Sequence, residues 1–285
     1  MKLGSLGTTS IGGTCFDWGR RTYVMGVINM TPDSFSGDGL GNDVGSAMRQ
    51  ALNFQEYGAD IIDVGGESTR PPMVYAGAAP TSADEELARV VPVIEALTRD
   101  LKVPVSIDTH KAGVAKEALK AGAAMINDVW GFTRDPDMAG VAAEAGVPVV
   151  LMHNQDHLEY HDLLPDVIGA LRRMRDVAVQ AGIGRDRIIL DPGMGFGKTA
   201  EHNLEILRRL DEFQVLECPL LVGMSRKSTI GKVLGVPPDD RIEGTAATVA
   251  LSIAKGADIV RVHDVREMAR VARMSDAIVR GWEPA

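Results

Sequence analysis

The chain has 285 residues and a formal net charge of −9, and 45% of its residues are hydrophobic and 24% charged, as in an ordinary globular protein. The negative charge argues against a nucleic-acid-binding surface, and no apolar run approaches the roughly 20 residues that cross a bilayer. The N-terminal segment lacks the apolar core of a signal peptide, so we expect a cytoplasmic protein that binds neither nucleic acid nor membrane. Cys15 and Cys218 have no CxxC spacing and are interpreted as packing residues.

Short β-rich apolar runs alternate with amphipathic stretches along the chain, which predicts strand–helix units and a parallel sheet covered by helices. The predicted strands are 24–28, 60–64, 104–107, 124–126, 147–152, 187–190, 219–223 and 258–262. Length alone would allow two domains. Eight such units favour instead one (β/α)8 TIM barrel that occupies the chain as a single domain, with the barrel proper over about residues 22–280.

Several predicted strands are preceded by the same short sequence motif, in which a helix ends in Ala-Gly or a similar pair and a strand follows at once. The motif occurs at 56–60 (EYGAD), 120–124 (KAGAA), 144–148 (EAGVP) and 255–259 (KGADI). Glycine suits the left-handed residue after a helix, so the repetition favours a barrel over an open sheet. Ahead of the first unit, residues 8–22 predict a short strand-turn-strand extension that plugs the barrel floor.

Polar side chains follow nearly every predicted strand, at the end of a barrel where active sites are built. In chain order they are Asn29, Asp63, Glu67, Asp108, Asn127, His153, Asp191, Arg226, Lys227, Arg261 and His263. Ordinary turn caps explain a few of them. They explain poorly why so many strands end in a hydrogen-bonding side chain, with carboxylates and amides early and cations late.

Seven segments carry a resemblance to a known family. They are NMTPDSFSGDG at 29–39, VGGESTRPP at 64–72, SIDTHK at 106–111, MINDVWG at 125–131, LDPGMGFGKT at 190–199, MSRKSTIG at 224–231 and RVHDV at 261–265. In this order, over roughly residues 20–280, they closely resemble dihydropteroate synthase, although any one alone is a weak signal.

The resemblance implies an enzyme with two small-molecule substrates. Such a transferase condenses 6-hydroxymethyl-7,8-dihydropterin diphosphate with p-aminobenzoate in folate biosynthesis, and releases pyrophosphate with the help of Mg²⁺. The resemblance also implies a homodimer formed through helices near the C-terminus, where residues 268–279 could offer an apolar face. Packing of that face on its own barrel is the alternative.

A pterin presents neighbouring N–H donors that suit a buried carboxylate, and other heteroatoms that suit an amide and a cation. By the resemblance, the pterin pocket contains Asp108, Asn127, Asp191, Lys227 and Arg261. All of these except the asparagine are candidate catalytic residues. For Asp191, a simple turn residue before Pro192 is the alternative interpretation.

Departure of pyrophosphate leaves negative charge that fixed cations or a metal must meet. Arg261 and His263 lie two residues apart, so their side chains lie on the same face of the predicted strand and can bind one phosphate group. Asn29 resembles the family's magnesium-associated position, where a carbonyl joins oxygens from phosphates and waters. The remaining cationic methylene could be stabilised by Asp108 and Asp191, which favours an SN1-like path.

The p-aminobenzoate carboxylate needs an anion site. Ser228 begins a predicted helix whose N–H groups can provide one, and Lys227 can assist it. The walls around the aminobenzoate ring resemble those of the family and consist of Thr69, Arg70, Pro71 and Phe196. A solvated loop arginine is the alternative for Arg70. No protein nucleophile is expected, since the chain lacks G-x-S-x-G and neither cysteine lies at a strand end.

Two motifs point towards other kinds of site. DPGMGFGKT resembles a Walker A loop, but Pro192 occupies the position of its first glycine, so we reject ATP binding there. His153, His157 and His161 recur every four residues, which suggests zinc if the stretch is helical. Because His153 closes a predicted strand, we interpret 153–162 as a polar loop instead. This run and His110 depart from the family pattern, in which other residues are common.

Two other functions fit parts of the pattern. A pterin-dependent methyltransferase, which passes a methyl group from a folate to a corrinoid protein, shares the barrel and part of the pterin-binding pattern. It has no diphosphate to hold, so SRKS at 225–228 and RVH at 261–263 favour the synthase. A pterin-binding paralogue without turnover should show damage in the first two loops, whereas NMTPDSF and GGESTRPP are complete.

Overall fold

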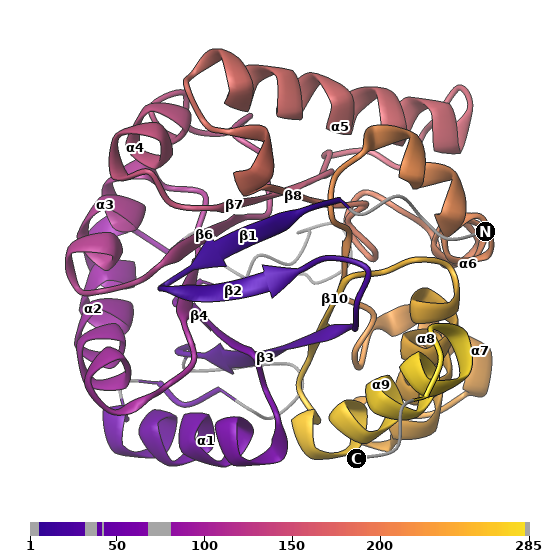
Figure 1. Ribbon diagram of the computed structural model, residues 1–285, viewed down its shortest axis with the longest axis horizontal. Helices are drawn as coiled ribbons and strands as arrows, with labels where there is room; N and C mark the ends of the chain where they lie inside the picture. Colours follow the sequence, from indigo (N-terminus) through magenta and orange to yellow (C-terminus); the bar gives the residue numbers. More distant parts are fainter. Residues whose placement is uncertain (1–5, 32–38, 42, 68–80, 283–285) are drawn as a thin grey trace.

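The structure is a computed structural model that describes residues 6–31, 39–41, 43–67 and 81–282. Within these ranges, eight parallel strands form one curved sheet with helices around its outside (Figure 1). The strands are β3 (Tyr23–Asn29), β4 (Ile61–Gly65), β5 (Val105–Asp108), β6 (Met125–Asp128), β7 (Val149–Met152), β8 (Ile188–Asp191), β9 (Leu221–Val222) and β10 (Ile259–Val262). All the predicted strands are confirmed.

The strands lie in the order β8, β7, β6, β5, β4, β3, β10 and β9. An additional parallel bridge between Leu190 and Leu220 brings the two edges of the sheet together. The sheet therefore forms a nearly closed (β/α)8 barrel, as the repeated strand–helix units predict. The predicted strand at 219–223 is the least regular of them, since β9 keeps only Leu221 and Val222 in the ladder.

Each strand is connected to the next through helical segments on the outer face of the barrel. The α-helices are α1 (Val44–Tyr57), α2 (Ala83–Asp100), α3 (Ala112–Lys120), α4 (Met138–Ala145), α5 (Leu163–Gln180), α6 (Ala200–Arg208), α7 (Ser228–Leu234), α8 (Ile242–Ala254) and α9 (Val265–Val279). Three 3₁₀ turns are η1 (Arg185–Arg187), η2 (Leu210–Leu216) and η3 (Pro238–Asp240). Over the described residues, we find no helix with the length and apolar character to span a bilayer.

The predicted helix-to-strand motifs have the expected geometry. Gly58 and Gly146 follow α1 and α4 with φ angles of 102° and 65°, in the left-handed region that favours glycine. Their backbone N–H groups donate back to carbonyls of the last helical turn. Only three residues separate each of these helices from the strand that follows, which keeps the barrel units short.

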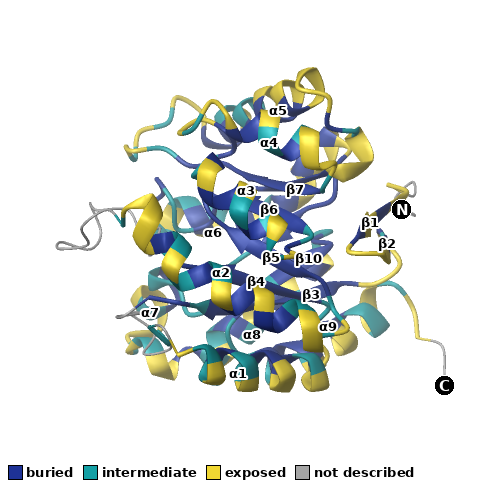
Figure 2. Ribbon diagram, turned by 90° about the vertical axis from the view of Figure 1, so that its left-hand side faces the viewer, coloured by how far each residue is buried: buried dark blue, intermediate teal, exposed yellow. Residues whose placement is uncertain are grey.

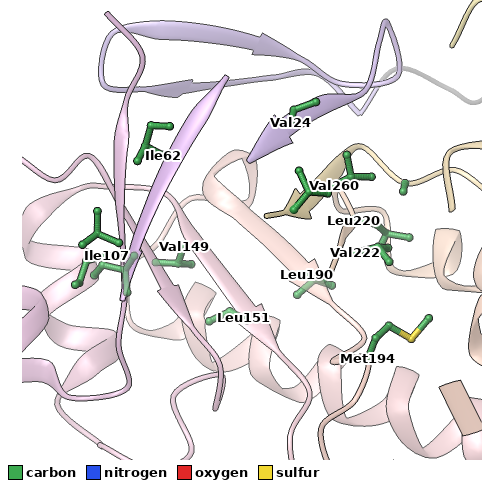
Figure 3. Close-up of a cluster of buried hydrophobic side chains, with 14 of the residues drawn as sticks. Val24, Ile62, Ile107, Val149, Leu151, Leu190, Met194, Leu220, Val222 and Val260 are labelled. Carbon is green, nitrogen blue, oxygen red and sulfur yellow. The ribbon is translucent and has the colours of Figure 1, made fainter. Parts of the chain in front are cut away.

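Alternate side chains of each strand point to opposite faces of the sheet. One set, which includes Val24, Ile62, Ile107, Val149 and Val260, packs against the buried faces of the helices (Figure 3). The helices expose their opposite faces, as Figure 2 shows by colour. The other set belongs to a separate inner cluster and includes Met25, Ile61, Met125, Val150, Ile189 and Ile259.

An N-terminal hairpin closes the inner cluster from the floor. β1 (Thr8–Ile11) pairs antiparallel with β2 (Thr14–Asp17), and the hairpin lies across the barrel in Figure 1. Ile11, Phe16 and Trp18 are buried and belong to the inner cluster. The predicted plug over residues 8–22 is confirmed. The interpretation of Cys15 as a packing residue is wrong: Phe16 takes the inward face of β2, so the neighbouring Cys15 is exposed.

Candidate active site

The sheet register places several predicted site residues side by side at the carboxyl ends of the strands. Asn29 of β3 pairs with Gly65 of β4, which pairs with Asp108 of β5, and Asp108 pairs with Asn127 of β6. Parallel strands end at the same edge, so polar side chains that close consecutive strands meet there. The small Gly65 separates Asn29 from Asp108 without filling the space between them.

Arg261 of β10 joins the carboxylates of this edge. Its Nε donates to Oδ2 of Asp63 at 2.7 Å, and one terminal nitrogen donates to Oδ2 of Asp108 at 2.7 Å. Asn127 Nδ2 donates to the same Asp63 oxygen at 2.9 Å. Four side chains from β4, β5, β6 and β10 therefore form one hydrogen-bonded cluster. Asp63 lies at its centre and is 0% exposed.

The cluster has unused hydrogen-bonding capacity. Within the described residues, Asp63 Oδ1 and Asp108 Oδ1 are buried and have no hydrogen-bond partner. Burial raises the pKa of Asp108 to about 8; Arg261 opposes this rise, and the neighbouring Asp63 carboxylate adds to it. Buried acceptors without donors cost free energy, so this edge of the barrel is suited to a ligand that brings N–H groups.

Asp191 is the last residue of β8 and Lys227 follows β9, on the opposite side of the barrel mouth. Asp191 Oδ1 accepts from the backbone N–H of Gly193 at 2.7 Å, so the alternative interpretation as a turn residue is also realised. Burial raises the pKa of Asp191, and Lys227 is the main opposing charge. Burial lowers the pKa of Lys227 to about 8, an effect that Asp191 opposes. Arg261 and Asp108 also act on Lys227, so both sides form one electrostatic unit.

Lys227 contacts the glycine-rich segment 192–198 that follows β8. Its Nζ donates to the carbonyl oxygen of Met194 and lies 4.4 Å from the ring centroid of Phe196. Gly195 has a φ of +80°, and a Cβ there would come within 2.9 Å of the Lys227 side chain. This glycine therefore allows the loop to approach the Lys227 side chain closely. In the Walker A loop that the motif resembles, glycines instead allow the backbone to approach phosphate groups.

His263 directly follows β10, and Arg226 lies in the loop after β9. The His263 ring nitrogen Nδ1 and the Ser225 hydroxyl are 3.0 Å apart, and the His263 backbone N–H donates to the same oxygen at 3.2 Å. Arg226 has a positive φ of 55°, and its Nε donates to Asp264 at 2.9 Å. Arg261 turns instead towards Asp63 and Asp108. The prediction that Arg261 and His263 grip one phosphate is not tested by these contacts.

The remaining predicted aminobenzoate residues divide into two groups. Phe196 lies against Lys227, and Ser228 is the first residue of α7, as predicted, with Lys227 in the capping position. Thr69, Arg70 and Pro71 lie outside the described residues. At the described end of that second loop, Glu67 accepts from Lys111 at 2.7 Å and from the backbone N–H of Thr81 at 3.0 Å.

The three histidines of the 153–161 run have different surroundings. His153 is buried at the end of β7, and its Nδ1 is 2.8 Å from Nζ of Lys198. His157 and His161 are exposed, and all three histidines line a cavity of about 380 Å³ beside α5. In the described part of the chain, no cluster of three or more His, Cys, Asp or Glu side chains is arranged to hold a metal ion.

Sequence reasoning missed two residues that the structure places in or beside the cluster. Asp63 was only one of many strand-end polar residues, yet it binds both Asn127 and Arg261. Its signal is a carboxylate within IIDVG, a strand that is buried throughout. Lys198 is not among the predicted site residues, but it is 6% exposed and bound to His153. A lysine after a glycine-rich segment gives no indication of such a partner.

The fold and the mouth of the barrel define the class: a (β/α)8 barrel with a buried polar cluster at the carboxyl ends of its strands. The family model described as pterin binding enzyme matches residues 25–263. The chain is 53% identical over 259 residues to the dihydropteroate synthase of Bacillus subtilis, covering 91% of this chain and 89% of that one. It is 52% identical over 271 residues to that of Clostridium beijerinckii, covering 95% and 99%.

Comparison with solved structures leads to the same family. The dihydropteroate synthase of Clostridium difficile, crystallised in the presence of pteroic acid, has a TM-score of 0.87 at 51% identity, covering 93% of this chain and 99% of that one. That of Xanthomonas albilineans, crystallised with 4-aminobenzoic acid, has a TM-score of 0.88 at 40% identity, covering 95% and 97%. The chain therefore belongs to the dihydropteroate synthase family, and it is a transferase.

Proposed function

We propose that this enzyme condenses 6-hydroxymethyl-7,8-dihydropterin diphosphate with p-aminobenzoate to give 7,8-dihydropteroate and pyrophosphate. The observation that carries the proposal is the gathering of Asp108, Asn127, Asp191, Lys227 and Arg261 at one mouth of the barrel. The similar Clostridium difficile and Xanthomonas albilineans proteins were crystallised with pteroic acid and 4-aminobenzoic acid. These ligands resemble the proposed product and amine substrate.

The pterin head is assigned to the cluster of carboxylates and amide. Asp108 Oδ1 is a buried acceptor with no partner among the described residues, and the Asn127 amide lies next to it in register. Asp191 lies across the mouth, where Lys227 balances its charge. A heterocycle with N–H donors on one edge and acceptors on another can satisfy both sides at once. The pterin thereby supplies hydrogen-bond donors that the described residues do not provide to Asp108 Oδ1.

The diphosphate is assigned to Arg261, His263 and Asn29. The contacts of Arg261 to Asp63 and Asp108 use Nε and one terminal nitrogen, so its five-donor guanidinium keeps donors for a phosphate oxygen. The same two carboxylates hold the guanidinium plane in place. A preorganised cation at this position stabilises the charge that develops on the leaving oxygen without reorganisation during the reaction.

Asn29 is the residue that would hold Mg²⁺. It closes β3 beside Gly65 and supplies a neutral amide oxygen, and the described residues contain no cluster of carboxylates or histidines that would bind a metal by themselves. This donor set suits a hard cation that takes most of its oxygen ligands from the diphosphate and from water. Bound there, Mg²⁺ would supply charge neutralisation on the phosphates.

The reaction exchanges one bond at the pterin methylene carbon. The bond from carbon to the bridging oxygen breaks, and its electron pair leaves with pyrophosphate. The nitrogen of p-aminobenzoate forms the new bond and then loses a proton. On an SN1-like path the methylene carries positive charge between these events, and the carboxylates of Asp108 and Asp191 flank the ring that shares that charge. No covalent enzyme intermediate is needed.

The aminobenzoate is assigned to the side of the mouth formed by Phe196, Lys227 and Ser228. Lys227 reaches both ligands, since it interacts with Asp191 of the pterin side and lies 4.4 Å from the Phe196 ring centroid. Its ammonium group can bind the carboxylate of the amine while the Phe196 ring contacts the benzene ring. Thr69, Arg70 and Pro71 lie outside the described residues, and their contribution to aminobenzoate binding stays a prediction from the family resemblance.

Pyrophosphate release tests the proposal. The purified protein is mixed with the dihydropterin diphosphate and Mg²⁺, and release is followed with and without p-aminobenzoate. We expect release to require the amine and to match the formation of dihydropteroate. Release at the same rate without the amine would show hydrolysis and contradict the proposal. Omission of Mg²⁺ should slow release, and unchanged release would remove the metal from the account.

We also propose a homodimer formed through α8 and α9, which pack against each other. Leu251 of α8 and Met274 and Ile278 of α9 are 56%, 63% and 72% exposed, and burial of such side chains favours association. Sedimentation velocity should give twice the chain mass of 30.5 kDa, and a monomer at micromolar concentration would contradict this.

We further propose a cytoplasmic location, which suits the free thiols of Cys15 and Cys218.

A further inference from the structure

Lys198 is a buried lysine outside the cluster of catalytic candidates. It is the next-to-last residue of the motif at 190–199, and its side chain reaches the carboxyl end of β7. Its Nζ lies 2.8 Å from His153 Nδ1, 3.0 Å from the Phe196 carbonyl oxygen and 3.4 Å from the His153 carbonyl oxygen. An ammonium group has three N–H donors and no acceptor, so this geometry satisfies it completely.

The protonation states fit these contacts. Burial lowers the pKa of His153 to about 2, with Lys198, Arg173 and His157 as further positive neighbours, so its ring is neutral and Nδ1 can accept. Burial also lowers the pKa of Lys198 to about 7, which Asp191 opposes and Lys227 reinforces. A buried cation that is costly to keep is consistent with a specific task for its contacts.

The contacts of Lys198 belong to a set that holds the segment 193–198 in one conformation. The Tyr160 hydroxyl donates to the Gly197 carbonyl at 2.8 Å, and the Gly195 N–H donates to Asn203 at 2.8 Å. A Cβ on Gly193 would lie 1.9 Å from the His153 carbonyl oxygen, so the segment packs directly on the end of β7. Within this set, Lys198 is the residue that binds Phe196 itself, because its Nζ donates to the Phe196 carbonyl oxygen.

We propose that Lys198, bound to His153, is a positioning residue that fixes Phe196 beside Lys227 and so shapes the aminobenzoate side of the active site. The inference rests on the proposed function. Lys198 does not touch the substrates; it acts through the Phe196 backbone. Loss of its contacts leaves two carbonyls and a ring nitrogen without a donor and releases the Phe196 end of the segment. The Asp191 end keeps its own bond to the Gly193 N–H.

The test is a steady-state comparison of Lys198→Met with the unaltered enzyme. We expect KM for p-aminobenzoate to rise about tenfold or more, because a displaced binding wall costs this much, while KM for the pterin diphosphate changes less than about threefold. The matched control is Lys120→Met on α3, whose side chain is 61% exposed and which should leave both values unchanged. Equal changes in both KM values, or none, would overturn the proposal.

Two further variants keep the test decisive if Lys198→Met folds poorly. Tyr160→Phe removes only the hydroxyl that binds Gly197, and it should shift KM for the amine in the same direction by a smaller factor. His153→Leu removes one of the three Lys198 contacts, so it should raise KM for the amine by a smaller factor than Lys198→Met. The double variant should behave like Lys198→Met alone, because that change already removes the contact to His153. Independent, additive effects would overturn the pairing. Lack of amine-dependent turnover in the unaltered enzyme would instead refute the proposed function.

Discussion

The floor and the mouth lie at opposite ends of the barrel and differ in how the hydrogen-bonding groups of their side chains are satisfied. At the floor, Phe16, Trp18 and Tyr23 pack with ring centroids 4.6 to 5.8 Å apart, and the Trp18 indole donates to Thr9 at 2.8 Å. At the mouth, Asp63 and Asp108 each retain a buried oxygen without a partner among the described residues. The floor is complete without a ligand, and the mouth is not.

The difference shows where this fold places stability and where it places chemistry. Aromatic packing at the amino ends stabilises the protein through buried apolar area and ring contacts. Buried carboxylates and cations at the carboxyl ends cost free energy that the rest of the fold must offset. The same contrast between packing and chemistry occurs along a single strand. Ile62 of β4 packs in the outer hydrophobic core, and the next residue, Asp63, binds Arg261 at the mouth. Variants at each end should separate the two purposes.

The largest expected effect is on stability, at the floor. Phe16 is 1% exposed within the inner cluster, so Phe16→Ala should lower the free energy of unfolding by about 3–5 kcal/mol. Urea denaturation measures this change. The KM values for both substrates should stay the same at a temperature where the variant is folded. A changed KM would mean that floor and mouth are not separable.

At the mouth the expected effect is on turnover. Arg261→Ala removes the cation that binds Asp63 and Asp108, so kcat/KM for the pterin diphosphate should fall by about 10²–10³-fold. The pKa of Asp108, already about 8, should rise further because its main opposing charge is gone. Steady-state kinetics with Arg270→Ala, an exposed arginine of α9, provides the control. Unchanged diphosphate affinity would remove Arg261 from its proposed role.

A smaller effect concerns pH. Lys227 has a pKa of about 8, so it is a cation below that pH and loses its charge as the pH rises through it. The neighbouring Asp191, Arg261 and Asp108 set this value together with burial. We therefore expect KM for p-aminobenzoate to be flat below pH 8 and to rise by up to about tenfold per pH unit above it. Lys227→Arg, which stays charged, should flatten the rise; an unaltered profile would contradict the assignment.

The sequence predicted the barrel well because its signals are local. Each strand is an apolar run of a few residues, and Gly58 and Gly146 mark where a helix must stop. The floor hairpin was also predicted, but the side of β2 on which Cys15 lies was not. A short strand reveals its alternation only once its partner is known, since Phe16 and Cys15 have similar apolar character.

The candidate site was predictable as a set of positions but not as a set of contacts. Strand-end polarity pointed to Asp108, Asn127, Asp191, Lys227 and Arg261, and barrel geometry brings them together. Which carboxylate Arg261 binds depends on side chains 153 and 198 residues away in the chain, and no local pattern encodes that choice. The pairing of Lys198 with His153 is equally remote, at a separation of 45 residues.

The most direct test of this account is an experimental structure of the protein with 7,8-dihydropteroate bound. We expect the bicyclic ring to lie within hydrogen-bonding distance of Asp108, Asn127 and Asp191, with the aminobenzoyl carboxylate near Lys227 and Ser228. A product molecule bound away from the carboxyl ends of the strands would contradict it.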